Sequence, residues 1–303
     1  MPVPFLERLD LCKVSISRDT VVFKGVHPVL SDVRLCAVTL PNDLGFLKNL
    51  RELHLNMVKG YSGTLPISKL YQILAGSPNL EQLELDADYI DDMLHPPPIL
   101  FIHLASFSLA SSKRGLGCPI TIITMIHAPN VTHLDVDFHL SRIPAGLNIF
   151  SAVTVQQLRQ ASHLTIEMSS TTFKLSTGTD GVTIKLSSWV DIMEHPARLL
   201  RRTNRIIPPS AHVDVLIDHS RHSMVVFDYL KSIRRAGYPF PELRKVHLIV
   251  FGWSNFPYKD LVADLARARP KIAEIIVQLP PYYGSKEEFF RWDAESSSLV
   301  LIE

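Results

Sequence analysis

Histidine and carboxylate side chains are the first residues in this sequence that could do chemistry. The chain has 13 histidines, and the densest cluster combines them with acids at Asp214, Asp218, His219 and His222. The two histidines, three positions apart, can reach one metal ion only where the backbone is helical or turned. No further ligand stands nearby in the sequence, so a metal site and a solvated polar loop remain alternatives. We favour the loop, and we expect neither a bound metal nor a cofactor.

Motifs of familiar catalytic chemistry are missing from the sequence. It contains no HExxH pair of zinc ligands and no GxSxG nucleophile turn. The Gly-Thr-Asp-Gly segment at 178–181 lacks the Lys-Ser/Thr of a phosphate loop and predicts a plain turn. Cys12, Cys36 and Cys118 are widely spaced and predict neither a disulfide framework nor a CxxC zinc pair. We therefore expect a protein that is not an enzyme, with an active site of unfamiliar type as the remaining alternative.

Composition and charge exclude further classes of function. The formal net charge of +1 argues against a nucleic-acid binder, in which basic residues normally outnumber acids. The most apolar segment, 119–131, is too short to cross a bilayer and contains His127 and Asn130. The first residues do not have the pattern of a secretory signal. We expect a cytoplasmic or nuclear protein with neither nucleic acid nor membrane as its partner.

A leucine-rich pattern predicts the elements that would position functional side chains. The template, apolar-x-x-apolar-x-apolar, begins at residues 6, 30, 50, 80, 104 and 131, in steps of 24, 20, 30, 24 and 27 residues. These steps match the period of roughly 20–29 residues of leucine-rich repeats, with one step slightly longer. The template returns at 161, 243 and 272 and fits only in part at 182 and 213.

The segments between the predicted strands have helical patterns. Helices are predicted over 67–74, 120–127 and 261–268, each followed by a short turn that contains proline. Each strand is too short to bury its face alone, so the strands must stack. We predict an α/β leucine-rich-repeat solenoid, curved, with a parallel sheet on its concave face and helices on its convex face.

The middle of the chain departs from this pattern. Residues 172–176 (TFKLS) and 182–187 (VTIKLS) alternate apolar and polar positions around a turn, which predicts an inserted antiparallel β-hairpin. A helix over 189–205, interrupted at Pro196, is predicted next. An apolar stripe predicts another helix that packs into the core, through Met224, Phe227, Leu230 and Ile233.

These patterns give the expected domain organisation. We predict one leucine-rich-repeat domain over 1–303. Regular repeats occupy 1–168, an irregular segment of hairpin and helix occupies 169–240, and terminal repeats occupy 241–303.

Four words of the sequence carry a resemblance to a known family. They are PFLERLDL at 4–11, LKNLRELHL at 47–55, SPNLEQLEL at 77–85 and APNVTHLDV at 128–136. Together they resemble the leucine-rich-repeat region of F-box proteins, especially those of mushroom-forming fungi. In that family an N-terminal F-box binds the Skp1-type adaptor of a ubiquitin ligase, and the repeats recruit the target. Because the first repeat begins close to Met1, we expect no F-box here and a Skp1-type adaptor as partner only if an F-box exists outside this chain.

The strand positions between the apolar template residues would form the concave face, because side chains alternate along a strand. From 52 to 167 these positions hold several acids and no lysine or arginine. The candidate protein-binding residues are Glu52, His54, Glu84, Asp86, His133, Asp135, Asp137 and Glu167. An acidic stripe of this kind favours a basic protein partner. The alternative is the ordinary polarity of a strand surface exposed to water.

The expected function is therefore protein–protein interaction, resembling target recruitment by the repeats of F-box ubiquitin-ligase subunits. The alternative is a truncated structural relict of such a protein that has no specific partner.

Overall fold

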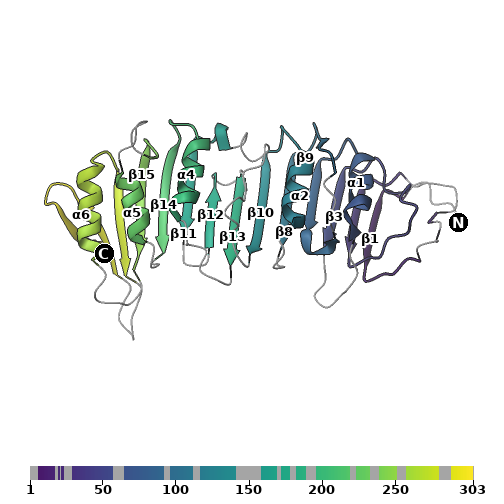
Figure 1. Cartoon of the computed structure of the whole chain (residues 1–303), viewed down its shortest axis with the longest axis horizontal. Coiled ribbons are helices and arrows are strands. Elements are labelled where there is room, and N and C mark those ends of the chain that lie inside the picture. The colour runs from purple at the N-terminus through teal and green to yellow at the C-terminus, as the bar shows by residue number, and fades with distance from the viewer. Residues whose placement is uncertain are drawn as a thin grey trace. The chain divides into compact units, whose positions relative to one another are not determined.

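The computed structural model divides the chain into two compact units. Unit 1 is Met1–Gln157 and unit 2 is Leu158–Glu303. The structure describes residues 6–17, 20, 22–23, 29–56, 65–91, 96–111, 117–140, 158–168, 172–177, 182–188, 196–218, 223–232, 239–250, 257–279 and 288–302. Within these ranges the fold is mixed α/β, with parallel strands and few helices (Figure 1). The single domain over 1–303 stays a prediction.

Unit 1 contains a parallel sheet whose strands follow the order of the chain. The strands are β1 (Arg8–Cys12), β2 (Asp32–Cys36), β3 (Glu52–Asn56), β5 (Gln82–Asp86), β8 (Ser106–Ser111) and β10 (His133–Leu140). Each begins two residues after a start of the leucine-rich template. Two short parallel pairs complete the unit, β4 (Leu65–Pro66) with β6 (Ile90–Asp91) and β7 (Ile99–Leu100) with β9 (Ile126–His127). The predicted parallel strands of the first repeats are confirmed.

One backbone hydrogen-bond pattern recurs before every strand of this sheet. The carbonyl of Glu7 accepts from the amide of Ser31 at 2.8 Å. The equivalent bond recurs before each later strand, at 2.8–2.9 Å. The amide of Arg51 donates to the carbonyl of Ser31, Glu81 to Arg51, Ala105 to Glu81, and Thr132 to Ala105. The repeats differ in length, yet each strand enters the sheet at an equivalent residue. We call this series the carbonyl ladder.

The core of unit 1 consists of the template residues that alternate with polar ones. The strands β2 and β3 share the same alternation of partly exposed and buried residues. Residues with 2% exposure or less fill the inward positions from β2 to β10: Val33, Leu35, Leu53, Leu55, Leu83, Leu85, Phe107, Leu109, Leu134 and Val136. Burial of each such side chain contributes roughly 1.5–3 kcal/mol, so the stack as a whole stabilises strands that could not persist alone.

Helices lie in front of the strands of unit 1 in Figure 1. They are α1 (Ile67–Ala75) and α2 (Gly117–Met125), with a short 3-10 helix, η1 (Ala87–Tyr89), between them in sequence. The core side of α1 buries Ile67, Leu70, Ile73 and Leu74. The predicted helix over 120–127 is too long at its end, because residues 126–127 form β9. His127 is exposed there and does not extend the apolar helix stripe.

Unit 2 combines parallel strands with four antiparallel pairings. Its sheet order is β13 (Val182–Ser188), β12 (Thr172–Ser176), β11 (His163–Met168), β14 (His212–Asp218), β15 (Leu243–Ile249), β16 (Glu274–Leu279), β17 (Glu288–Asp293) and β18 (Ser298–Ile302). The strands from β11 through β14 and β15 to β16 are parallel. The antiparallel pairings are β11 with β12, β12 with β13, β16 with β17 and β17 with β18. Because β12 and β13 pair antiparallel, the predicted hairpin is confirmed. The sequence predicts terminal repeats over 241–303, whereas β17 and β18 form an antiparallel pair there.

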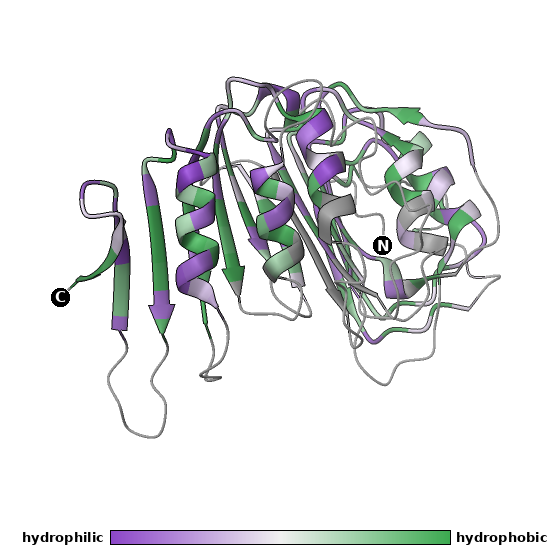
Figure 2. Ribbon diagram, turned by 60° about the vertical axis from the view of Figure 1, so that its left-hand side comes forward, coloured by the Kyte–Doolittle hydropathy of each residue, from purple (hydrophilic) through white to green (hydrophobic). Residues whose placement is uncertain are grey.

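Three helices of unit 2 lie on one side of its sheet (Figure 2). They are α4 (Pro196–Ile206), α5 (Ser223–Lys231) and α6 (Tyr258–Ala268). Pro196 was expected to interrupt a helix, but it occupies the first helical turn, where its missing N–H costs nothing. The predicted core stripe of α5 is partly wrong. Phe227 and Leu230 are buried, whereas Met224 is 49% exposed and Ile233 lies outside the described residues.

Arg269 joins the end of α6 to the end of α5 and to the residues before β15. The residue is 5% exposed, and its guanidinium donates to the carbonyls of Leu230, Pro239 and Phe240 at 3.1, 2.9 and 2.7 Å. The amide of Phe240 donates in turn to Oδ1 of Asn204 at 2.7 Å. A planar guanidinium can satisfy several carbonyls at once, which the ammonium of a lysine cannot do with the same geometry.

Membrane insertion through a helix has no support among the described residues. None of the helices there combines the length and the apolar composition that a bilayer span requires.

We predict that Arg269→Lys lowers the free energy of unfolding by about 2–3 kcal/mol, because buried carbonyls lose their donors. Urea unfolding followed by circular dichroism measures this change. Arg267→Lys is the matched control, since Arg267 lies two positions away, is 75% exposed and contacts Asp264 and the carbonyl of Ala263 at the surface. Its expected cost is about 0.5 kcal/mol or less. Equal losses for the two variants would contradict the role given to Arg269.

Candidate functional site

The parallel register of unit 1 arranges the polar strand positions in rows. One row contains Arg8, Asp32, Glu52, Gln82, Ser106 and His133. The next contains Asp10, Arg34, His54, Glu84, Ser108 and Asp135. These side chains and those that follow them at the strand ends form what we call the polar face of unit 1. It is the surface opposite the buried template residues.

Seven of the eight predicted binding residues belong to this face: Glu52, His54, Glu84, Asp86, His133, Asp135 and Asp137. The structure brings Glu52, His54 and Glu84 close together. Asp86 has a local structural role, because its Oδ1 accepts from the amide of Asp88 at 2.9 Å and caps η1. The eighth residue, Glu167, lies on β11 of unit 2.

His54 lies between two carboxylates from its own and the next strand. Its Nδ1 donates to Oε2 of Glu84 at 2.8 Å, and its Nε2 lies 3.8 Å from Oε2 of Glu52. Asn56 donates to the other carboxylate oxygen of Glu84 at 3.3 Å. The imidazole is only 15% exposed. His54 therefore links β3 to β5 and holds the Glu84 carboxylate in one orientation.

Arginines on β1 and β2 balance the acid nearest to them. Asp32 forms ion pairs with both arginines. Its Oδ2 lies 3.3 Å from Nε of Arg8, and its Oδ1 lies 3.6 Å from Nε of Arg34. Arg8 and Arg34 thus offset the charge of Asp32 at the β1 and β2 end of the polar face. Farther along the sheet, β5 and β10 place acids on the polar face, and β5, β8 and β10 place no lysine or arginine there.

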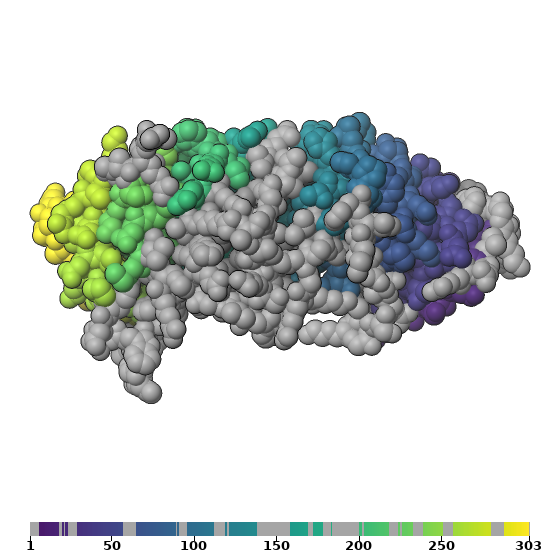
Figure 3. Space-filling model, in the orientation of Figure 1, coloured from purple at the N-terminus to yellow at the C-terminus, as the bar shows by residue number. Residues whose placement is uncertain are grey.

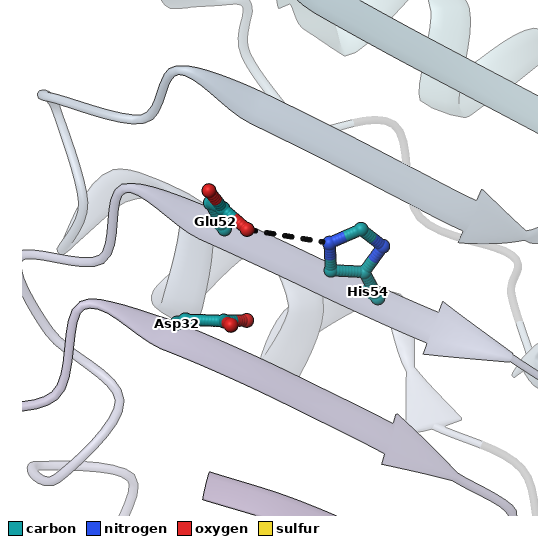
Figure 4. Close-up of side chains that lie close together, drawn as sticks. All are labelled: Asp32, Glu52 and His54. Carbon is teal, nitrogen blue, oxygen red and sulfur yellow. Dashed lines mark ion pairs between the residues drawn. The ribbon is translucent and has the colours of Figure 1, made fainter. Parts of the chain in front are cut away.

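Asp32, Glu52 and His54 also form a geometrical candidate for a metal site (Figure 4). Their ligand atoms lie within 4.8 Å of one another. Carboxylate oxygen and imidazole nitrogen suit zinc and related ions, and Glu84 has the position of a supporting carboxylate behind His54. However, a divalent cation at Asp32 would lie beside two guanidinium groups. We interpret the cluster as a charge network that orders the polar face.

The acid and histidine cluster noted in the sequence near 214–222 is placed only in part. Oδ2 of Asp214 lies 3.1 Å from Nε2 of His163 on the neighbouring strand. His219 and His222 lie outside the described residues, and so does the side chain of Asp218. The described part of this cluster is a cross-strand pair.

Charges on the sheet of unit 2 are paired across strands. Glu167 lies 2.9 Å from Nζ of Lys174 on the adjacent hairpin strand, and Lys245 lies 3.1 Å from Glu274. The leucine-rich template does not indicate which strand pairs with β11. The sequence therefore could not show that Lys174 lies opposite Glu167. In this unit Glu167 belongs to an ion pair, which weakens its claim to be part of an acidic stripe.

A groove in unit 1 follows the starts of the strands. It has a volume of about 630 Å³ and is lined by Glu7, Val29, Leu30, Ser31, Asn49, Arg51, Asn79, Glu81 and His103. Val29 is 73% exposed there, and Arg51 and Glu81 form an ion pair at 3.9 Å. The recurring asparagine before the template leucine, at 49 and 79, was the sequence signal that could have indicated this groove.

The helices α4, α5 and α6 cover the opposite side of the sheet of unit 2. In the space-filling view, coloured side chains of α5 and α6 close over the strands of unit 2 (Figure 3).

Comparisons with protein-family models, curated proteins and solved structures find no match for this chain. The site is therefore interpreted from its own geometry.

The imidazole of His247 lies partly buried on β15, in the sheet of unit 2. Burial lowers the pKa of this imidazole below its ordinary value of 6.5, and the charge of Lys245 lowers it further. A hydrogen bond with Gln278 and the charge of Glu274 oppose this shift. The folded protein therefore binds a proton at His247 less readily than the unfolded chain does.

We predict that this histidine costs stability as the pH falls through its ordinary titration range, near 6.5. Above that range both states are neutral at His247, and below it the unfolded state is protonated first. Urea unfolding of the wild type and of His247→Gln at a series of pH values measures the effect, and the other histidines cancel in the comparison. The wild type should lose more stability toward acid than the variant. A constant or reversed difference would contradict the assignment.

Proposed function

We propose that the chain is a protein–protein interaction module built on leucine-rich repeats, and that it binds its partner through the polar face of unit 1. It resembles the repeats with which F-box ubiquitin-ligase subunits recruit their targets. On this proposal no bond is made or broken, and recognition depends on shape and charge.

The carbonyl ladder is the observation that carries the proposal. The loops between repeats differ in length, but each strand begins from an equivalent hydrogen bond at 2.8–2.9 Å. Loop variation is therefore absorbed away from the strands, and the polar positions stay in rows. Repeat proteins use such rows as extended binding surfaces, because side chains can vary on a constant backbone. A curved solenoid with this sheet on its concave face is the architecture that the proposal assumes.

The charge of the polar face favours a basic partner. Arg8 and Arg34 balance the acids at the β1 and β2 end. The acids that β5 and β10 place on the polar face are Glu84, Asp86, Asp135 and Asp137, and β5, β8 and β10 place no lysine or arginine there. Complementary charge would raise the rate of association and disfavour acidic competitors. We therefore place the binding region at β5, β8 and β10.

A Skp1-type adaptor enters the proposal only if an F-box exists outside this chain. A relict of a repeat protein that has no specific partner is the competing interpretation, and the following experiment separates the two.

We predict that a partner recovered by affinity purification from the native cells binds the wild type at least about 10-fold more tightly than the triple variant Glu84→Lys, Asp135→Lys, Asp137→Lys. Asp86 is left unchanged because it caps η1. Mass spectrometry identifies the partner, and titration with the purified proteins measures the dissociation constants at low and moderate salt.

The matched control reverses three exposed acids of unit 2, at Glu242, Asp260 and Glu288. This control has the same change in net charge and should bind as the wild type does. Circular dichroism verifies that both variants are folded. If the two variants bind equally, the polar face is not the binding surface. If the wild type recovers no reproducible partner, the relict interpretation is favoured.

A further inference from the structure

Two cysteines lie opposite each other at the ends of neighbouring strands of unit 1. Cys12 of β1 and Cys36 of β2 are partners in the parallel register, and both are free thiols. Both side chains belong to the polar face, because they alternate with the inward residues Leu11 and Leu35. Cys12 is exposed and Cys36 is partly exposed. The sequence separates them by a whole repeat and gives no sign of this contact.

The backbone around both cysteines is fixed in the same way. The residue after each cysteine, Lys13 or Ala37, has a left-handed conformation, with φ of 57° and 53°. The amide of Lys13 donates to the carbonyl of Cys36 at 2.8 Å, and the amide of Ala37 donates to that of Asn56 at 3.0 Å. Few residues other than glycine adopt this conformation without support from neighbouring structure. Both chains therefore turn away at the same level, and the thiols remain side by side.

The strand spacing is compatible with a disulfide between them. Neighbouring strands lie about 4.8 Å apart, and disulfides join Cα atoms about 4.4–6.8 Å apart. The spacing is near the short end of this range, where a disulfide is held away from its preferred geometry and is more easily reduced. Exposure of Cys12 adds to this lability, because a reducing thiol can reach it.

We propose that Cys12 and Cys36 are an oxidation site that forms a reversible disulfide on reaction with a glutathione-type disulfide. This site is independent of the proposed binding region on β5, β8 and β10.

The exchange has two balanced steps. The thiolate of Cys12 attacks one sulfur of glutathione disulfide, which forms a mixed disulfide and releases one glutathione thiolate. The thiolate of Cys36 then attacks the sulfur of Cys12, which closes the protein disulfide and releases the second glutathione thiolate. The protein gives up two electrons and two protons, and the two glutathione thiolates take them up.

The second step depends on pH through the thiol of Cys36. Burial raises the pKa of the Cys36 thiol, and its hydrogen bond with Cys12, the charge of Cys12 and that of Asp10 raise it further. The ammonium of Lys13 acts in the opposite direction. Because only the thiolate attacks, closure of the disulfide becomes faster as the pH rises.

The test uses the full chain in a Cys118→Ser background, in which Cys12 and Cys36 are the remaining thiols. The protein is equilibrated in buffers of increasing glutathione disulfide over glutathione, and free thiols are then blocked. We predict an intact mass lower by two hydrogens, reversed by excess glutathione, and a tryptic cross-link between peptides 9–13 and 35–48. The cross-link should form faster at higher pH.

Cys36→Ser in the same background is the matched control, and it should accumulate a mixed disulfide with glutathione on Cys12. Oxidation of the unfolded protein in urea should also yield mixed disulfides, because the register is then lost. If the folded protein gives only glutathione adducts, or dimers through Cys12 on a non-reducing gel, the proposal is overturned.

Discussion

In-register parallel pairing of very short strands is the constraint on which the structure of unit 1 depends. Strands β1, β2, β3 and β5 have only five residues each, too few to bury an apolar face alone. Pairing places the template leucines of successive repeats one above another, and the carbonyl ladder sets the point at which each strand begins. A slip of one residue would exchange the buried and the exposed side chains of a strand. The core and the polar face are therefore two results of one register.

The same register explains the contacts that could have functional meaning. His54 reaches Glu84, Asp32 meets Arg8, and Cys12 faces Cys36 because each pair occupies equivalent positions on adjacent strands. These groups are distant in sequence, and no local propensity brings them together. Charges alternate at the β1 end of the face, whereas acids predominate toward β10. The proposed binding region and the proposed oxidation site therefore occupy different parts of one surface.

The sequence predicted the elements better than it predicted the contacts. Spacing of leucines and the turns that contain proline indicated the strands of the first repeats and the positions of α1 and α6, because burial imposes these periods. The predicted helix at α2 ended two residues too late, because apolar Ile126 fits a helix and a strand equally well. The sequence pattern also placed Met224 in the core, where only Phe227 and Leu230 are buried. Lys174 opposite Glu167 and the carbonyl contacts of Arg269 depend on tertiary placement, which periodicity does not contain.

Cross-linking of engineered cysteine pairs tests the register most directly. In a background without Cys12, Cys36 and Cys118, the pair Gln82→Cys with Ser106→Cys occupies register partners on β5 and β8. The pair Gln82→Cys with Ser108→Cys is displaced by two residues, about 8 Å away and beyond the reach of a disulfide. We predict that mild oxidation links the first pair rapidly within one molecule and leaves the second largely unlinked. Equal yields, or preferential linkage of the displaced pair, would contradict the register and with it the polar face.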